Sequence, residues 1–155
     1  MLSKSKYFNH TGYIEGFYGK LLKWSDRERI LLKLNSNEMT TYFYAPKEDV
    51  FHRINWRKLY PKNQIASFLL FNTLAKQKKI NFIMGIAPGL DFNFKGLLDK
   101  PSTNSDLKKL KRKCEQIISF GVKKIALMFD DIEPSSFFDT ESDNKEGECH
   151  AFIAN

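Results

Sequence analysis

The stretch at residues 124–132 constrains the fold more than any other part of the chain. Residues 125–129 are consecutively apolar, and two carboxylates, Asp130 and Asp131, follow directly. An apolar run without alternation is typical of a strand buried on both faces in a parallel sheet. Because burying unpaired carboxylates is costly or forces their protonation, we expect both aspartates where this strand leaves the sheet. Ligands of α/β folds bind at such carboxyl ends, although capping of the next helix by Asp130 is the alternative.

Strand-like and helix-like segments alternate along the rest of the chain. β-branched and aromatic runs predict strands that begin near residues 13, 40 and 81, before the strand near residue 124. Apolar residues at helical spacing predict helices over residues 24–34, 61–79 and 105–120. Ser25, which Glu28 follows in a capping-box pattern, and Ser105 are the expected N-caps. We expect a solvated acidic loop over residues 139–148 and the start of a helix at residues 149–155.

This β-α-β-α-β-α-β pattern, with connections long enough for right-handed crossovers, favours an α/β fold. If the four strand ends face one pocket, the arrangement is that of a (β/α)8 barrel, which needs about 250 residues. The chain has 155 residues, so it has room for about the first four βα units. Such a half-sheet would have exposed edges. The chain is therefore a fragment, or another copy completes it, or the sheet is open and doubly wound.

Composition limits the classes of protein to which the chain can belong. The net charge of +7 comes mainly from lysines spread along helical segments, which favours a solvated surface over a nucleic-acid partner. Cys114 and Cys149 lack metal-binding spacing and indicate free thiols in a reducing compartment. No apolar stretch approaches about 18 residues, and the start has no signal-peptide pattern. We expect a protein of the cytoplasm or nucleus, without a membrane partner.

Several residues stand at the predicted strand ends. Gly16 follows the first strand and allows a sharp turn or a close approach to a ligand. Lys47 lies just beyond the second strand, at the level expected for Asp130. His52 lies in the following loop, where a lone histidine is more often a surface residue or a satisfied polar group than a catalyst. Asp91 lies in the loop after the third strand.

Five short motifs together resemble glycoside hydrolase family 84, the β-N-acetylglucosaminidases that include protein O-GlcNAcase and bacterial hyaluronidase-like enzymes. Each motif is weak alone, but they occur in order and at fitting spacing between residues 12 and 132. The motifs are GYIEGFYG (12–19), TYFYAPKED (41–49), FHR with the following WR (51–53 and 56–57), APGLD (87–91) and LMFDDI (127–132).

The resemblance implies a TIM-barrel enzyme that removes β-linked N-acetylglucosamine with retention, assisted by the substrate's acetamido group. Asp130 would hold and polarise the acetamido N–H, and Asp131 would act as general acid and then as general base. Gly16 and Lys47 match positions that contact sugar hydroxyls. The resemblance implies no cofactor or metal, and the partners would be O-GlcNAc-modified proteins or GlcNAc-terminated glycans, with association of two copies as a further expectation.

The same comparison divides the chain into a leader (1–11), family-like βα units (12–132), and an acidic loop with the start of the next helix (133–155). Residues 20–24 depart from the family, since they lack its proline and make the first loop longer. Further sugar-binding residues of the family lie on later strands. Two other readings stay open: a non-catalytic binding protein of the same fold, and a hyaluronidase-like exo-glycosidase.

Overall fold

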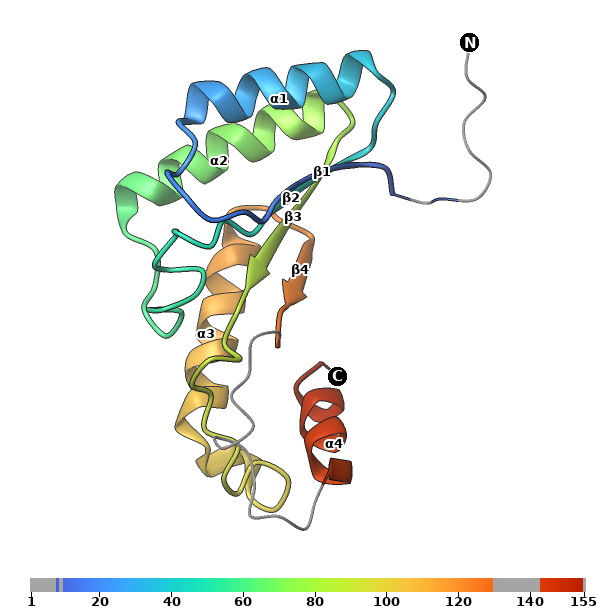
Figure 1. The fold of residues 1–155 in the computed structure, drawn as a ribbon. Coiled ribbons are helices and arrows are strands. Elements are labelled where there is room, and N and C mark those ends of the chain that lie inside the picture. Colours follow the sequence, from blue (N-terminus) through green and yellow to red (C-terminus); the bar gives the residue numbers. More distant parts are fainter. Residues whose placement is uncertain (1–7, 9, 130–142, 155) are drawn as a thin grey trace.

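Four parallel strands form one sheet in the computed structural model, which describes residues 8, 10–129 and 143–154. The sheet order follows the chain order, and each strand pairs in parallel with the next. The alternating α/β pattern predicted from the sequence is confirmed, and the strands begin within one residue of the predicted positions (Figure 1). The strands are β1 Gly12–Glu15, β2 Thr41–Tyr44, β3 Asn81–Ile86 and β4 Lys124–Leu127.

A helix follows each strand, and the last one departs from the prediction. The helices are α1 Trp24–Ser36, α2 Lys62–Gln77, α3 Ser105–Ser119 and α4 Asp143–Ala154, with a short 3-10 helix at Pro101–Thr103. The predicted acidic loop over residues 139–148 is wrong for residues 143–148, which are helical. Acidic residue types are favourable at the first turn of a helix, where the macrodipole is positive, so a polar stretch can begin one.

Both predicted serine N-caps are wrong by one or two positions. Lys23 occupies the N-cap of α1 and makes no side-chain cap, so Ser25 lies inside the helix. Asn104 caps α3, because its side-chain oxygen accepts a hydrogen bond from the Leu107 N–H at 2.9 Å. Ser105 is therefore the first helical residue. Asparagine and serine are equally good caps, so two such residues in a row leave the choice open.

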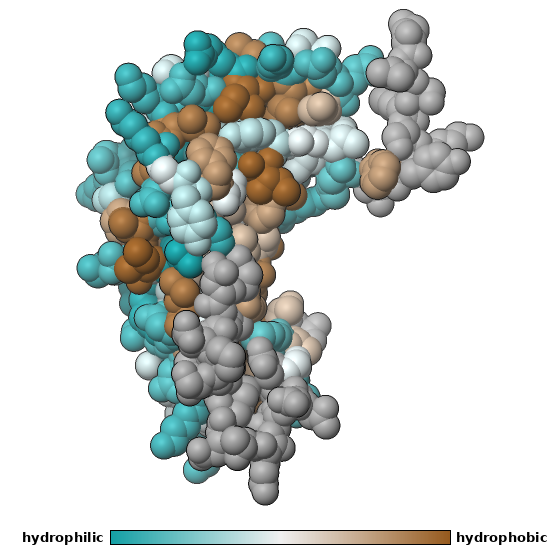
Figure 2. Space-filling model, in the orientation of Figure 1, coloured by the Kyte–Doolittle hydropathy of each residue, from teal (hydrophilic) through white to brown (hydrophobic). Residues whose placement is uncertain are grey.

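Helices pack on one face of the sheet, and the opposite face is exposed near β1 but buried beside His52 at the end of β3. Tyr42 of β2 and Phe82 of β3 each pack against Phe71 of α2, with ring centroids 5.0 Å apart. On the opposite face Ile14 is 62% exposed. In Figure 2, hydrophilic side chains cover the outer surface of α1, and apolar side chains gather between it and the sheet. In the described part of the chain the helices seen against the sheet lie on one face, as in consecutive βα units of a (β/α)8 barrel, whereas a doubly wound sheet carries helices on both faces.

A buried ion pair joins the end of β1 to α1. The Glu15 side chain is fully buried, and the Arg27 guanidinium donates to it through Nε, at 2.9 and 3.2 Å, and Nη2, at 2.7 Å. The Tyr42 hydroxyl donates to the same carboxylate at 2.7 Å. Burial, the largest single effect, acts to lower the pKa of Arg27, but the hydrogen bonds to Glu15 together with the charges of Glu15, Tyr42 and Tyr44 offset it, and the pKa lies above its ordinary value. Sequence patterns did not indicate this pair.

Among the described helices, none combines the length and the apolar character that crossing a bilayer requires.

Candidate active site

The loops after β1 and β2 meet at the carboxyl edge of the sheet and carry two predicted site residues. Gly16 directly follows β1, and Lys47 lies three residues beyond β2 and is partly buried. The Ala45 N–H donates to the Glu15 carbonyl at 3.0 Å, and the Lys47 N–H donates to the Phe17 carbonyl at 3.4 Å. Gly16 and Lys47 therefore lie on loops that backbone hydrogen bonds hold side by side.

Asp49 anchors the loop that carries Lys47. Its buried carboxylate accepts hydrogen bonds from the Tyr44 hydroxyl at 2.7 Å, the Tyr60 hydroxyl at 3.1 Å and the Phe51 N–H at 2.9 Å. The pKa of both tyrosines lies well above the ordinary value. Burial is the largest cause, and the negative charge of Asp49 is the second. The tyrosines therefore remain neutral donors, and the loop is held by a buried carboxylate that has three partners.

Lys113 of α3 is buried beneath this loop. Its Nζ donates to the Lys58 carbonyl at 2.6 Å and lies 3.6 Å from the centre of the Tyr60 ring. Burial lowers the pKa of Lys113 to about 7, although the nearby charge of Asp49 opposes the shift. Sequence reasoning missed this residue, because a lysine in an amphipathic helix is ordinarily assigned to the solvated face.

The lowered pKa predicts a pH-dependent stability that Lys113→Met removes. Between about pH 7 and 10.5 the unfolded chain holds a proton on Lys113 that the folded chain lacks, so stability rises with pH by at most about 1.4 kcal/mol per unit. Below about pH 7 both states are protonated and the slope from this group disappears. Urea unfolding at pH 7, 8 and 9 should show a shallower slope for Lys113→Met. The exposed Lys111→Met is the control, and equal slopes in all three proteins would contradict the prediction.

His52, in the loop after β2, is fully buried and lies beside the carboxyl end of β3. Its Nδ1 is 2.9 Å from the Gly85 carbonyl, and its own carbonyl accepts from the Ala87 N–H at 2.9 Å. A side chain at Gly85 would lie 3.0 Å from the His52 ring and 3.1 Å from the Met128 sulfur. Glycine at this position in β3 therefore makes room for the imidazole. Of the two non-catalytic possibilities that the sequence left open, the surface residue is wrong, because the imidazole is buried and its Nδ1 lies within hydrogen-bond distance of the Gly85 carbonyl.

The loops after β2 and β3 are tied together by an aromatic and ionic cluster. The Trp56 Nε1–H donates to Asp91 at 2.8 Å, and the buried indole stacks on Phe92 with ring centroids 5.7 Å apart. Arg57 forms ion pairs with both Asp91 and Asp106. The hydrogen bonds to Asp106 are the largest influence on the pKa of Arg57 and raise it, so the guanidinium stays positively charged. The cluster holds the second and third loops together.

The end of β4 completes the edge as far as residue 129. The Met128 N–H donates to the Ile86 carbonyl at 2.8 Å, so the pairing with β3 continues past the last residue of the strand. Phe129 packs against Phe94 and stacks on His150 of α4, at centroid distances of 6.1 and 4.5 Å. Asp130 and Asp131, the predicted catalytic pair, lie outside the described residues.

A family model described as beta-N-acetylglucosaminidase matches residues 11–155. The chain belongs to this family of glycoside hydrolases. The resemblance found in the sequence motifs is thereby confirmed. Barrel enzymes have their active sites at the carboxyl ends of the strands, and in this chain four parallel strands end at one edge of the sheet.

Relatives and solved structures agree with this membership. Over 122 residues the chain is 37% identical to the proteins named Protein O-GlcNAcase of Rattus norvegicus and Mus musculus, which covers 79% of this chain and 13% of each relative. A structure of CpGH84B matches 96% of this chain with a TM-score of 0.80 and 31% identity, and the match covers 24% of that structure. A point mutant of the Thermobaculum terrenum O-GlcNAc hydrolase matches with a TM-score of 0.80 and 29% identity, over 96% of this chain and 31% of that structure.

Proposed function

We propose that the chain supplies the sugar-activating part of a retaining β-N-acetylglucosaminidase that removes O-GlcNAc from serine and threonine of glycoproteins. One observation carries the proposal most directly: parallel strands end at one edge, where hydrogen-bonded loops carry Gly16 and Lys47. The fourth strand ends at Leu127, three positions before Asp130 in the sequence. Membership of the β-N-acetylglucosaminidase family supports the class of reaction.

In this proposal the substrate's own acetamido group is the nucleophile. Asp130 accepts a hydrogen bond from the acetamido N–H, and its negative charge favours the positive charge that develops as the carbonyl oxygen attacks the anomeric carbon. The bond to the leaving oxygen breaks while Asp131 donates a proton to that oxygen. Asp131 then accepts a proton from the water that opens the oxazoline. Two inversions at one carbon give retention, without a carboxylate nucleophile.

The two carboxyl groups need opposite protonation states at the start of the reaction. Two neighbouring carboxylates repel each other when both are ionised. Their proximity and any difference in burial therefore separate the pKa values of the two groups. We therefore propose that Asp130 is ionised while Asp131 is protonated. The rate should then show a bell-shaped dependence on pH, with one limb for each group.

The described loops offer groups suited to a pyranose. The Lys47 ammonium can donate hydrogen bonds to sugar hydroxyls. Gly16 lets the sugar approach the backbone closely. Phe17 and Tyr18 beside it are 42% and 62% exposed, so their rings are available to pack against a sugar or aglycone. Further groups would come from additional βα units or from a second copy of the chain.

The proposal is tested by hydrolysis of 4-nitrophenyl N-acetyl-β-glucosaminide. We would assay the chain alone and a chimera in which residues 12–132 replace the matching segment of the Thermobaculum terrenum hydrolase. The chimera should be active, and Asp131→Asn should lower its kcat by about 10²- to 10⁴-fold, the usual contribution of a general acid or base. Asp99→Asn, at an exposed position, is the matched control and should leave kcat unchanged.

Each outcome of the assay has a definite meaning. Activity of the chain alone that Asp131→Asn abolishes would show that copies of this chain assemble a working site. Activity confined to the chimera would show that the chain's residues are catalytic only in a longer barrel. A folded but inactive chimera would overturn the proposal in favour of a non-catalytic binding protein.

A further inference from the structure

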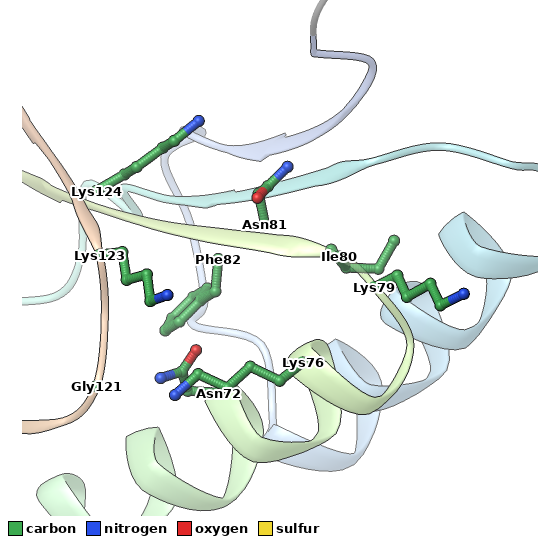
Figure 3. Close-up of a pocket in the computed structure, with 9 residues that line it drawn as sticks. All are labelled: Asn72, Lys76, Lys79, Ile80, Asn81, Phe82, Gly121, Lys123 and Lys124. Atoms are coloured by element: carbon green, nitrogen blue, oxygen red, sulfur yellow. The ribbon is translucent and has the colours of Figure 1, made fainter. Parts of the chain in front are cut away.

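A basic cavity lies at the amino-terminal edge of the sheet, opposite the candidate active site. It has a volume of about 330 Å³ and lies between α2 and the segment that links α3 to β4 (Figure 3). Four of its nine lining residues are lysines, and none is aspartate or glutamate. The lysines are Lys76, Lys79, Lys123 and Lys124.

Two of these lysines converge inside the cavity. In Figure 3 the side chains of Lys76 and Lys123 approach Asn72 from opposite sides, whereas Lys79 and Lys124 point away from it. The position that a Cβ atom would occupy at Gly121 is 2.9 Å from Lys76 Nζ and 3.2 Å from Asn72 Nδ2. Gly121 has φ +76° and follows the last turn of α3. Its missing side chain leaves this side of the cavity open.

Among the residues that the structure describes, no carboxylate pairs with the lysines of the cavity. No ion pair between described residues includes any of the four lysines. Lys124 donates to the ring nitrogen Nε2 of His10 at 3.0 Å, an interaction that adds no negative charge. Lys76 and Lys123 line the cavity, which is open to solvent.

Compensation of helix dipoles is the ordinary explanation for lysines near the ends of helices. Lys76 lies in the last turn of α2, and Lys123 follows the end of α3. Each helix C-terminus is equivalent to about −0.5 charge, so two of them balance about one of the two positive charges that converge in the cavity. About one converging charge remains unbalanced, and Lys79 and Lys124 add further positive charge at the lining although they point away. Dipole compensation alone therefore does not account for all of this charge.

We propose that this cavity binds a phosphate-class dianion, either inorganic phosphate or a phosphate monoester. Lysine ammonium groups bind phosphate as point charges, and Lys76 and Lys123 would contact its oxygens. Asn72 uses one N–H to donate to the Phe120 carbonyl at 2.9 Å, and its amide nitrogen carries a second N–H for the ligand. The volume falls within the range of small-molecule sites, about 300 to 1,000 Å³, so a monoester also fits. The site is independent of the proposed glycosidase chemistry.

The proposal is tested by titrating the chain with sodium phosphate against sodium chloride at equal ionic strength, followed by ¹H–¹⁵N NMR and by thermal unfolding. Phosphate should cause saturable shifts of amides near residues 72–82 and 121–124 and a saturable rise in Tm. The double variant Lys76→Gln/Lys123→Gln should weaken binding about tenfold or more, since hydrogen bonds to charged groups are lost. The control Lys108→Gln/Lys111→Gln, which removes the same charge from exposed positions of α3, should change binding by less than about twofold.

The same variants separate an anion site from simple dipole compensation. In sodium chloride, the Lys76→Gln/Lys123→Gln variant should have a Tm equal to or higher than that of the parent chain, because it relieves repulsion between like charges. A lower Tm of this variant, together with no response of the parent chain to phosphate, would overturn the proposal. Equal weakening by the control pair would also overturn it, since only net charge would then matter. If the double variant does not fold, Lys123→Gln alone provides the test at an exposed position. Tighter binding of glycerol 3-phosphate than of phosphate would identify a monoester, and equal binding would identify the inorganic ion.

Discussion

Arg27→Met should lower the free energy of unfolding by about 3 to 5 kcal/mol, the usual cost of breaking a buried ion pair by removing one partner. Glu15 has no exposed surface and receives three of its hydrogen bonds from Arg27. Methionine approximates the length of the arginine stem but has no donor, so among the described donors the Glu15 carboxylate would keep only the Tyr42 hydroxyl. A buried charge with one neutral donor is poorly solvated.

Arg29→Met on the same helix is the matched control. Arg29 pairs with Asp26 at 2.8 Å, a distance similar to the shortest one in the buried pair, but its side chain is 81% exposed. An exposed pair of this kind contributes at most about 1 kcal/mol. Urea unfolding followed by far-UV circular dichroism measures both variants. Similar losses for Arg27→Met and Arg29→Met would show that Glu15 is reached by water and that the pair is not a buried anchor.

The order of the helices and strands could be predicted because each type of element has a characteristic spacing of apolar residues and characteristic residues at its ends. The run Ile125–Leu127 and the aromatic stretch of β2 read as strands, and Pro46 marks where the second strand must stop. Helix starts were less predictable, because Asn104 and Ser105 are both good caps and only the tertiary position decides between them. Local residue types fix the kind of element better than its first residue.

The candidate site was predictable where it depends on strand ends and unpredictable where it depends on contacts across the fold. Gly16 and Lys47 follow strands, so a parallel sheet brings them to one edge, as observed. The burial of Glu15 and Lys113 has no such signal, since their partners come from other elements. A helical lysine or a strand-end glutamate has the same local pattern whether it is solvated or buried. Only the packing of α1 and α3 distinguishes the two cases.

Trp56→Ala should lower the free energy of unfolding by about 3 to 5 kcal/mol, as is typical for a large aromatic residue removed from a core. Trp56 is fully buried, stacks on Phe92 and donates to Asp91, and so links the loop after β2 to the loop after β3. Its loss would leave a cavity between the loops and remove the hydrogen bond that the indole donates to Asp91. Arg57, which lies over the same ring at 4.4 Å, would also lose its support.

Trp56→Phe distinguishes the packing of the ring from its hydrogen bond. Phenylalanine keeps most of the contact with Phe92 and loses only the N–H donated to Asp91, which is 55% exposed and can be solvated instead. We therefore expect Trp56→Phe to cost about 1 to 2 kcal/mol, well below the loss in Trp56→Ala. The chain has two tryptophans, so Trp24 remains as the fluorescent reporter of unfolding in both variants. Equal losses in the two variants would mean that the hydrogen bond to Asp91, rather than the buried ring, holds the second and third loops of the candidate site together.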